Sequence, residues 1–125
     1  IKARFKGEGK IVEGYSGDKL VGYVITAKGE GYSSIIKMLV GLTTDYKIKG
    51  VTILSQQETP GLGDRASKPD FLNQFPGKGV EQLKVLKGIP QGDDHITAIT
   101  GATITSRAVT EGVEKSIQAL ISEKK

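Results

Sequence analysis

Glycine is spread through the chain in a way that limits what it can fold into. The 125-residue sequence contains 17 glycines, which separate short apolar runs instead of gathering in one linker. This is about twice the usual share of ~7%, and the spacing indicates many turns. Residues 10–15 and 19–27 read as two strands, because Ser16, Gly17 and Asp18 between them fit a tight hairpin turn.

Two further runs, residues 35–42 and 47–57, are apolar and β-branched, and Thr43, Thr44 and Asp45 lie between them. This pattern favours a second hairpin, although the first of the two runs fits a short helix equally well. Residues 58–63 come next. We expect them to form a loop, because they contain a proline that fixes φ and two glycines that permit backbone shapes a Cβ would block.

The middle of the chain predicts little regular structure. Ser67 can cap a short helix that has Pro69 in its first turn and runs to about Gln74. The Pro-Gly pair at 76–77 should then stop it. Residues 81–86 are expected to form another strand, and residues 97–99 are expected to be extended.

The last third of the chain carries a clear helical pattern. Residues 104–121 place apolar side chains three and four positions apart, which puts them on one helix face. These side chains are Ile104, Ala108, Val109, Val113, Ile117, Leu120 and Ile121. Strands first and a helix last predict a single α+β domain over residues 1–125. It should have a largely antiparallel sheet of hairpins, a short mid-chain helix and a long C-terminal helix.

The residue types exclude several classes of site. The chain has no Cys and one His, which excludes zinc fingers, thiolate-bound clusters and cysteine nucleophiles. Neither Gly-Lys pair continues into a P-loop, and no Gly-x-Ser-x-Gly nucleophile elbow is present. Residues 61–66 match a relaxed dinucleotide pattern, but prolines flank it where a strand and a long helix are needed. We expect no catalytic residue and no metal site, and we expect His95 to be an exposed loop residue.

Charge and hydropathy point to no nucleic acid and no membrane span within this sequence. The formal net charge is +4, from 18 basic and 14 acidic residues spread along the chain. Lys2, Arg4 and Lys6 alternate as on the solvent face of a strand. No aromatic residue lies in a basic cluster that resembles a base-stacking platform, so nucleic-acid binding is a minor alternative. The longest apolar run falls far short of the ~20 residues of a membrane helix.

Hydroxyl and small side chains gather at the head of the C-terminal helix. Residues 100–106 read Thr-Gly-Ala-Thr-Ile-Thr-Ser. Free N–H groups of a first helical turn attract anions, and small residues admit a ligand closely, so a phosphate site is one interpretation. Thr and Ser also cap helices, with a contribution of ~1 kcal/mol, so capping is the other interpretation.

Three segments resemble the covalent FMN-binding domain family. Thr-Gly-Ala-Thr at 100–103 is similar to the family's flavinylation motif, Glu-Thr-Pro-Gly-Leu-Gly at 58–63 to the loop that lines the flavin, and Gly-Glu-Gly-Tyr-Ser at 29–33 to its Gly-rich aromatic segment. The resemblance covers about residues 14–120. The cofactor-binding residues that it implies are Tyr32, Ser33, Glu58, Thr59, Pro60, Gly61, Leu62, Gly63, Thr100, Gly101, Ala102, Thr103, Thr105 and Ser106.

The resemblance implies a role for several of these residues. Thr103 would receive FMN through a phosphoester bond made by a transferase that uses FAD, and Thr105 is a less favoured acceptor. Gly61 and Gly63 would let the backbone approach the flavin ring and Leu62 would pack on it. Side chains of Glu58 or Thr59 would bond its polar rim, and Arg107 would stabilise the phosphodiester charge. Thr97 departs from the family, because an acidic residue usually stands three positions before the motif.

The family includes the G subunit of Rnf-type ion-translocating complexes and the C subunit of sodium-translocating NADH:quinone reductase. The resemblance therefore implies an electron-transfer protein whose partners are the other members of a membrane complex. The chain opens with Ile1, so we expect an excised domain whose N-terminal anchor precedes it and which lies on the extracytoplasmic side of the cell membrane. The alternatives are a flavin domain of another membrane regulator or reductase partner, and a non-redox phosphate-binding module.

Overall fold

An antiparallel sheet forms the body of the domain. The computed structural model describes residues 3–6, 11–31, 34–58, 60–61, 63–86 and 95–124. Its main sheet contains β1 (Ala3–Lys6), β2 (Ile11–Ser16), β3 (Lys19–Glu30), β4 (Ile35–Leu42) and β5 (Ile48–Ser55), in that order across the sheet. Each strand is antiparallel to the next. Strands that follow one another in the chain are therefore neighbours in the sheet, as the predicted hairpins require.

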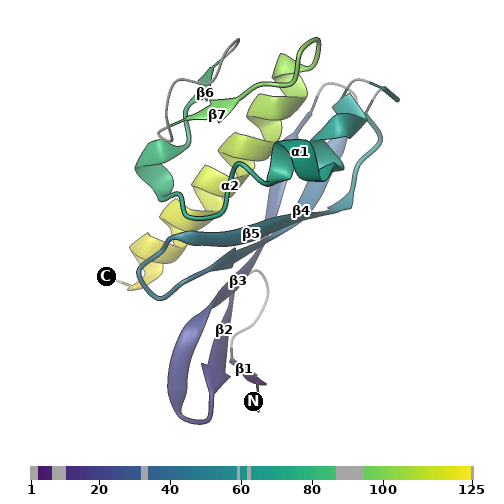
Figure 1. Cartoon of the computed structure of the whole chain (residues 1–125). Helices are drawn as coiled ribbons and strands as arrows, with labels where there is room; N and C mark the ends of the chain where they lie inside the picture. The colour runs from purple at the N-terminus through teal and green to yellow at the C-terminus, as the bar shows by residue number, and fades with distance from the viewer. Residues whose placement is uncertain are drawn as a thin grey trace.

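Strand β3 is long enough to pair with β2 near its start and with β4 near its end. Residues 19–25 pair with β2, where Ser16 lies opposite Lys19, and residues 23–30 pair with β4, where Glu30 lies opposite Ile35. Figure 1 shows β1, β2 and the adjoining half of β3 extending to one end of the molecule, away from the helices. The turn after Ser16 uses Gly17 at φ 62°, a left-handed conformation that favours glycine.

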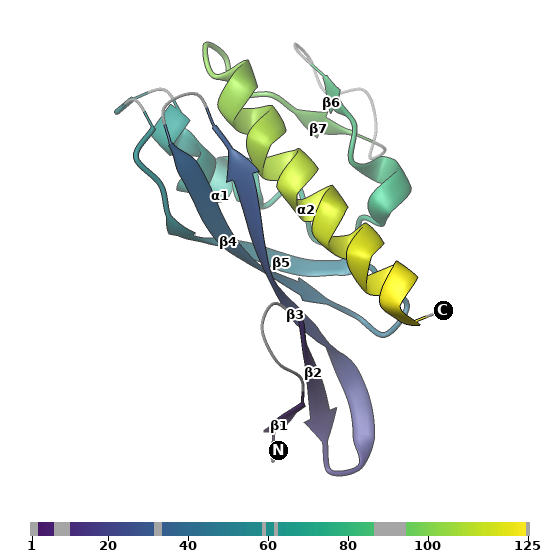
Figure 2. The same cartoon turned by 180° about the vertical axis from the view of Figure 1, so that it is seen from behind.

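The long helix α2 (Thr103–Lys124) covers the opposite half of the sheet. Figure 2 shows α2 lying across β3 and β4, and residues of these elements are in contact. On β4, Ile36, Met38, Val40 and Leu42 are buried in strict alternation with more exposed residues. They form one hydrophobic core with the buried face of α2. Side chains alternate with a period of two along β4 and recur with a period of 3.6 along α2, so each element turns one apolar face toward the other.

Glycine lets α2 approach the sheet closely. A Cβ at Gly29 would lie 2.7 Å from the Ala108 carbonyl carbon, and a Cβ at Gly112 would lie 2.6 Å from the Lys28 carbonyl oxygen. These distances are too short for any real side chain. The helix backbone therefore touches the β3 backbone, which fixes the position of the helix start against the sheet.

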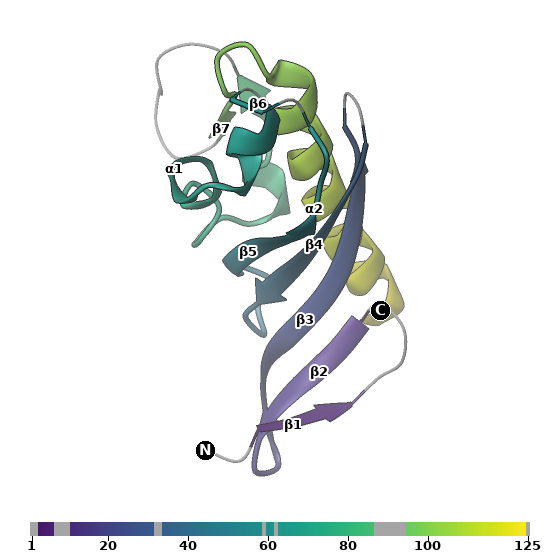
Figure 3. The same ribbon diagram turned by 90° about the vertical axis from the view of Figure 1, so that its right-hand side faces the viewer.

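Short elements fill the space between β5 and α2. They are the 3₁₀ helix η1 (Gly63–Ser67), α1 (Pro69–Leu72), the 3₁₀ helix η2 (Val80–Gln82), and the parallel pair β6 (Val85–Leu86) and β7 (Ile96–Thr97). Figure 3 shows α1, β6 and β7 grouped with the start of α2 at one end of the molecule. Phe71 and Phe75 anchor this group, because both are buried and their rings pack edge to face.

Most of the predicted elements are confirmed. The α+β class, both hairpins and the C-terminal helix are present, and residues 35–42 form a strand instead of a helix. Of the predicted loop at 58–63, the described residues Glu58, Pro60 and Gly61 lie outside helices and strands, and Gly63 begins η1 (Gly63–Ser67). Lys10 of the predicted first strand and Lys2 of the alternating basic run lie outside the described residues. Among the described residues no helix is long and apolar enough to cross a membrane.

Three predictions about the middle of the chain were wrong. Ser67 does not cap α1: the N-cap position belongs to Lys68, and the Ser67 hydroxyl donates to the Asp64 carbonyl oxygen inside η1. Residues 81–86 are not one strand, because Gln82 folds back to Gly79 through a backbone and a side-chain hydrogen bond and only Val85–Leu86 is extended. His95 is buried, not exposed, and its Nε2 lies 3.3 Å from the Thr97 hydroxyl.

The contact between α2 and β3 gives a direct stability prediction. Gly29→Ala should lower the free energy of unfolding by about 1–3 kcal/mol, because the added methyl collides with helix backbone that cannot move independently. Gly50→Ala is a matched control on β5, since a Cβ there meets nothing within 4 Å, and it should stay within about 1 kcal/mol of the wild type. Urea unfolding measures both. Equal stability of the two variants would contradict the close contact.

Candidate functional site

The Thr-Gly-Ala-Thr segment forms the turn that starts α2. Gly101 has φ 82°, in the left-handed region, and the Ala102 N–H donates to the Ile99 carbonyl oxygen at 2.9 Å. The helix then begins at Thr103, whose side chain is half-buried. Thr100, before the turn, is exposed. The motif therefore presents a threonine hydroxyl at the first residue of a long helix.

Ser106 holds this turn from behind. It is fully buried, its hydroxyl donates to the Ala102 carbonyl oxygen at 2.8 Å, and it accepts the Ile99 N–H at 2.9 Å. One side chain thus joins the residue before the turn to the residue inside it. The resemblance implied that Ser106 binds the cofactor, but its hydroxyl lies inside the protein and holds the backbone of the motif.

Glu58 connects the three segments that the sequence singled out. Its side chain is only 4% exposed. One carboxylate oxygen accepts the Thr105 hydroxyl at 2.8 Å, and the other accepts the Ser34 hydroxyl at 2.6 Å. The loop at 58–63, the first turn of α2 and the connection between β3 and β4 therefore meet at one buried carboxylate. The sequence predicted Ser33 in this region, and nothing in its spacing pointed to Ser34.

Two glycines provide the space for this carboxylate. A Cβ at Gly31 would lie 2.7 Å from the Glu58 carboxyl carbon. A Cβ at Gly63 would lie 2.7 Å from both the Glu58 Cβ and the Thr105 hydroxyl. Packing around Glu58 therefore requires glycine at position 31 of the Gly-rich segment and at position 63 of the loop.

The other described residues of the loop, Pro60 and Gly61, lie at the surface. Gly61 has φ 80° and its N–H donates to the Asp64 carboxylate at 2.8 Å, which closes the loop onto η1. Pro60 and Gly61 are exposed. Tyr32, Ser33, Thr59 and Leu62, which the resemblance also placed at the flavin, lie outside the described residues.

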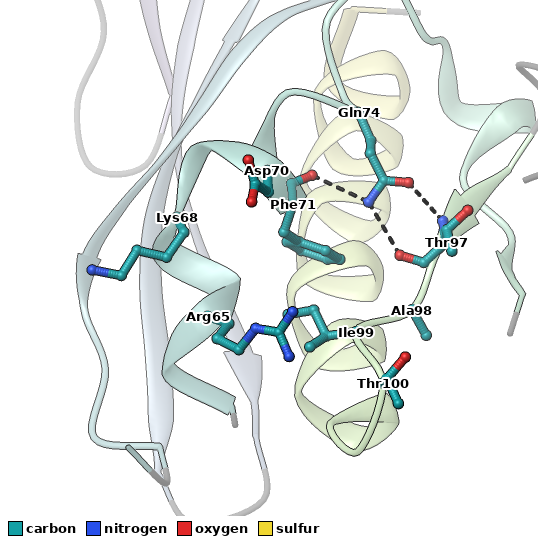
Figure 4. Close-up of a pocket in the computed structure, with 9 residues that line it drawn as sticks. All are labelled: Arg65, Lys68, Asp70, Phe71, Gln74, Thr97, Ala98, Ile99 and Thr100. Atoms are coloured by element: carbon teal, nitrogen blue, oxygen red, sulfur yellow. Dashed lines mark hydrogen bonds between the residues drawn. The ribbon is translucent and has the colours of Figure 1, made fainter. Parts of the chain in front are cut away.

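A surface cavity adjoins the motif on the α1 side. It has a volume of about 420 Å³ and is lined by Arg65, Lys68, Asp70, Phe71, Gln74, Thr97, Ala98, Ile99 and Thr100. Figure 4 shows the Gln74 amide, two residues after α1, bonded to the Thr97 backbone: its oxygen accepts the Thr97 N–H at 2.7 Å, and its nitrogen donates to the Thr97 carbonyl at 3.1 Å.

The cavity contains residues that the sequence did not reveal as a group. Figure 4 shows the Arg65 guanidinium extending toward Ile99, whereas the Lys68 side chain, also of a lining residue, points away from them. Arg107, the cation predicted to stabilise a phosphodiester, is exposed on α2 and is not among the lining residues. Thr97, the position at which the resemblance implies an acidic residue, is half-buried and lines the cavity. The sequence contained one signal for Arg65 as a residue of the site, which is its position two residues after the loop at 58–63.

A family model describes most of this architecture. The model of the FMN-binding domain matches residues 31–118, which include the loop at 58–63, the Thr-Gly-Ala-Thr motif and residues 31–33 of the Gly-rich segment. The chain belongs to this family. Its membership accounts for the joint occurrence of the motif, the loop and the long helix in one domain.

Curated relatives are components of ion-translocating complexes. The chain is 44% identical over 102 residues to the G subunit of the proton-translocating ferredoxin:NAD(+) oxidoreductase complex of Clostridium ljungdahlii. It is 46% identical over 112 residues to the G subunit of the Na(+)-translocating complex of Acetobacterium woodii. These alignments cover 82% and 87% of this chain but 55% and 54% of the relatives. The chain thus spans about half the length of the curated relatives it matches.

Solved structures show the same fold. NqrC of Shewanella oneidensis matches with a TM-score of 0.75 at 27% identity, over 90% of this chain and 60% of that one. The C subunit of the Na(+)-translocating NADH-quinone reductase of Parabacteroides distasonis matches with a TM-score of 0.71 at 28% identity, over 89% of this chain and 60% of that one. The antiparallel sheet with a long C-terminal helix is therefore an NqrC-like fold.

The residues present fit an FMN attached through its phosphate. Thr103 is half-buried at the first residue of α2, the N–H groups of a first helical turn favour an anion, and Arg65 and Lys68 are among the residues that line the adjoining cavity. Apart from these groups, the site offers Pro60 and Gly61 as exposed loop backbone.

The bridging role of Ser106 can be measured. Ser106→Ala should destabilise the domain by about 1–3 kcal/mol, because the Ile99 N–H loses its partner in a buried place. Ser116→Ala is the matched control on the same helix, since its hydroxyl donates only to the nearby Val113 carbonyl, and should cost about 1 kcal/mol or less. Thermal or urea unfolding compares them. Equal costs would show that Ser106 does not hold the motif.

Proposed function

We propose that this chain is the FMN-carrying electron-transfer domain of an Rnf-like ion-translocating membrane complex, in the position of the G subunit, with FMN joined to Thr103 by a phosphoester. The observation that supports this most strongly is the meeting of the motif, the loop and the Gly-rich segment at Glu58. The two curated relatives from Clostridium ljungdahlii and Acetobacterium woodii support the class of complex.

Burial separates the candidate acceptors. The Thr105 hydroxyl is 2% exposed and donates to Glu58, so its attachment to a phosphate would require breaking that hydrogen bond and opening the core. Thr103 is half-buried at the first residue of α2, with the helix N–H groups beside it. Thr100 is exposed, but it precedes the turn at Gly101 and lies outside the helix. Of these three threonines, Thr103 alone combines access with the helix terminus.

Attachment needs a transferase, because a threonine hydroxyl is a weak nucleophile. With FAD as donor, the Thr103 oxygen forms a bond to the FMN phosphorus, the bond to AMP breaks, and the hydroxyl proton passes to a base of the transferase. The product is a phosphodiester with one negative charge. The N-terminus of α2 stabilises such a charge by about 0.3–1 kcal/mol at a surface, and Arg65 and Lys68 add positive potential nearby.

Bound FMN supplies the redox chemistry, accepting and releasing one or two electrons. The chain's own residues would bind and orient it. Pro60, Gly61 and Gly63, with Thr59 and Leu62 of the same loop and Tyr32 and Ser33 of the Gly-rich segment, are proposed to line the ring. Glu58, Thr105 and Ser106 would hold those segments from inside. The partners would be the flavin transferase and the other proteins of the complex, at the extracytoplasmic side of the membrane, with an N-terminal anchor.

The decisive measurement is the intact mass of the domain after exposure to FAD and a flavin transferase, followed by peptide mapping. The wild type should gain the mass of FMN less one water on Thr103. Thr103→Ala should gain nothing, whereas Thr44→Ala, which changes an exposed threonine in a distant turn, should be modified fully. Covalent flavin that persists in Thr103→Ala would contradict the assignment of the acceptor.

A second variant separates the flavin function from recognition by the transferase. Thr97→Asp restores the acidic residue usual in the family and should raise the rate of modification, because it completes the motif that the transferase reads. If neither the wild type nor Thr97→Asp is modified while a control domain is, the covalent flavin function is wrong. An uncoloured protein that binds phosphate at the helix terminus would then favour the anion-binding alternative.

A further inference from the structure

A hydrogen-bonded chain centred on Glu58 joins residues far apart in sequence. Thr105 is 47 positions from Glu58 and Ser34 is 24 positions from it, and both hydroxyls donate to the carboxylate. The Ser34 hydroxyl also accepts the Gln57 N–H at 3.0 Å, and the Ser34 carbonyl accepts the Gly31 N–H at 2.8 Å. The chain therefore runs from α2 through the loop to the end of β3.

The surroundings leave this chain little freedom. Glu58 and Thr105 are 4% and 2% exposed, and Gly31 and Gly63 lie so close that no Cβ fits at either position. Exclusion of water strengthens a hydrogen bond. The loop is consequently fixed at its first residue to the first turn of α2.

The hydrogen bond from Thr105 to Glu58 lies close in sequence to Thr103, the proposed acceptor of FMN. Thr105 lies two residues after Thr103 in the same helical turn, and its side chain points to the interior while Thr103 reaches the surface. Glu58 is the first residue of the loop that carries Gly61 and Gly63. The Thr105–Glu58 hydrogen bond thus joins the start of that loop to the helical turn that carries Thr103.

We propose that Thr105, Glu58 and Ser34 form a clamp that fixes the start of the loop, at Glu58, to the helical turn that carries Thr103, so that Thr105 and Glu58 act as positioning residues for the flavin. This inference rests on the proposed function for its purpose, but the clamp itself is a property of the chain without flavin. It assigns Glu58 and Thr105 to orientation of the site instead of direct contact with the flavin ring.

Hydrogen exchange in the flavin-free domain tests the clamp. Thr105→Val keeps the shape of the side chain and removes its hydroxyl, so amide exchange in the peptide covering residues 58–66 should become at least about tenfold faster. Thr110→Val is the matched control: Thr110 is also a fully buried threonine on α2, but its hydroxyl donates only to the Ser106 carbonyl. It should leave exchange in that peptide within about twofold of the wild type.

Two further variants keep the test decisive. Thr105→Ser restores a hydroxyl and should return the exchange to wild-type rates. Ser34→Ala changes a half-buried residue and should accelerate the same peptide even if Thr105→Val fails to fold. The clamp is overturned if the loop peptide exchanges at the wild-type rate in Thr105→Val and Ser34→Ala, or if Thr110→Val accelerates it equally.

The loaded protein gives an independent measurement. Where the transferase modifies Thr103, the visible circular dichroism of the flavin should change in Thr105→Val and recover in Thr105→Ser, with Thr110→Val unchanged. An identical spectrum in Thr105→Val would show that the loop does not position the flavin. Absence of modification in the wild type would overturn the proposed function, whereas the exchange rates still decide whether the clamp exists.

Discussion

Burial of the Glu58 carboxylate is the interaction on which the candidate site depends. A polar group removed from water is costly unless hydrogen bonds replace its hydration. Here the hydroxyls of Thr105 and Ser34 serve that purpose, and Gly31 and Gly63 leave the necessary space. The carboxylate can be accommodated only when α2, the loop and the end of β3 are all in place. Formation of the site is therefore coupled to completion of the fold.

The coupling requires that α2 approach β3 unusually closely. Because Gly29 and Gly112 lack side chains, the backbones of the two elements touch, and the first turn of α2 lies beside the end of β3. Residues that are apolar on the sheet and on the helix provide the stabilisation, and the glycines set the distance. Core packing thus determines where Thr103 and Thr105 lie, although neither belongs to the hydrophobic core.

Local patterns predicted the elements, and long-range contacts determined the details that the patterns missed. Alternation along residues 35–42 and the helical spacing after Thr103 each reflect one buried face, so both are visible in the sequence. The partner of Glu58 is not, because nothing local distinguishes a carboxylate that bonds Thr105 from one that faces solvent. His95 followed two aspartates and suggested an exposed loop, but its burial comes from tertiary packing. Arg65 and Gln74 lie on either side of α1 in the sequence, and the packing of α1 brings both to the cavity.

The two sides of the α2 terminus have different tasks. Its inner side is occupied by the hydrogen bond from Thr105 to the buried Glu58 side chain, and its outer side offers N–H groups at Thr103. A phosphodiester on Thr103 would bring one negative charge to that outer side, where a helix N-terminus favours an anion. Arg65, on the cavity that reaches Thr100, provides positive charge on the same side. One helix terminus can therefore combine a buried structural hydrogen bond with an exposed ligand anion.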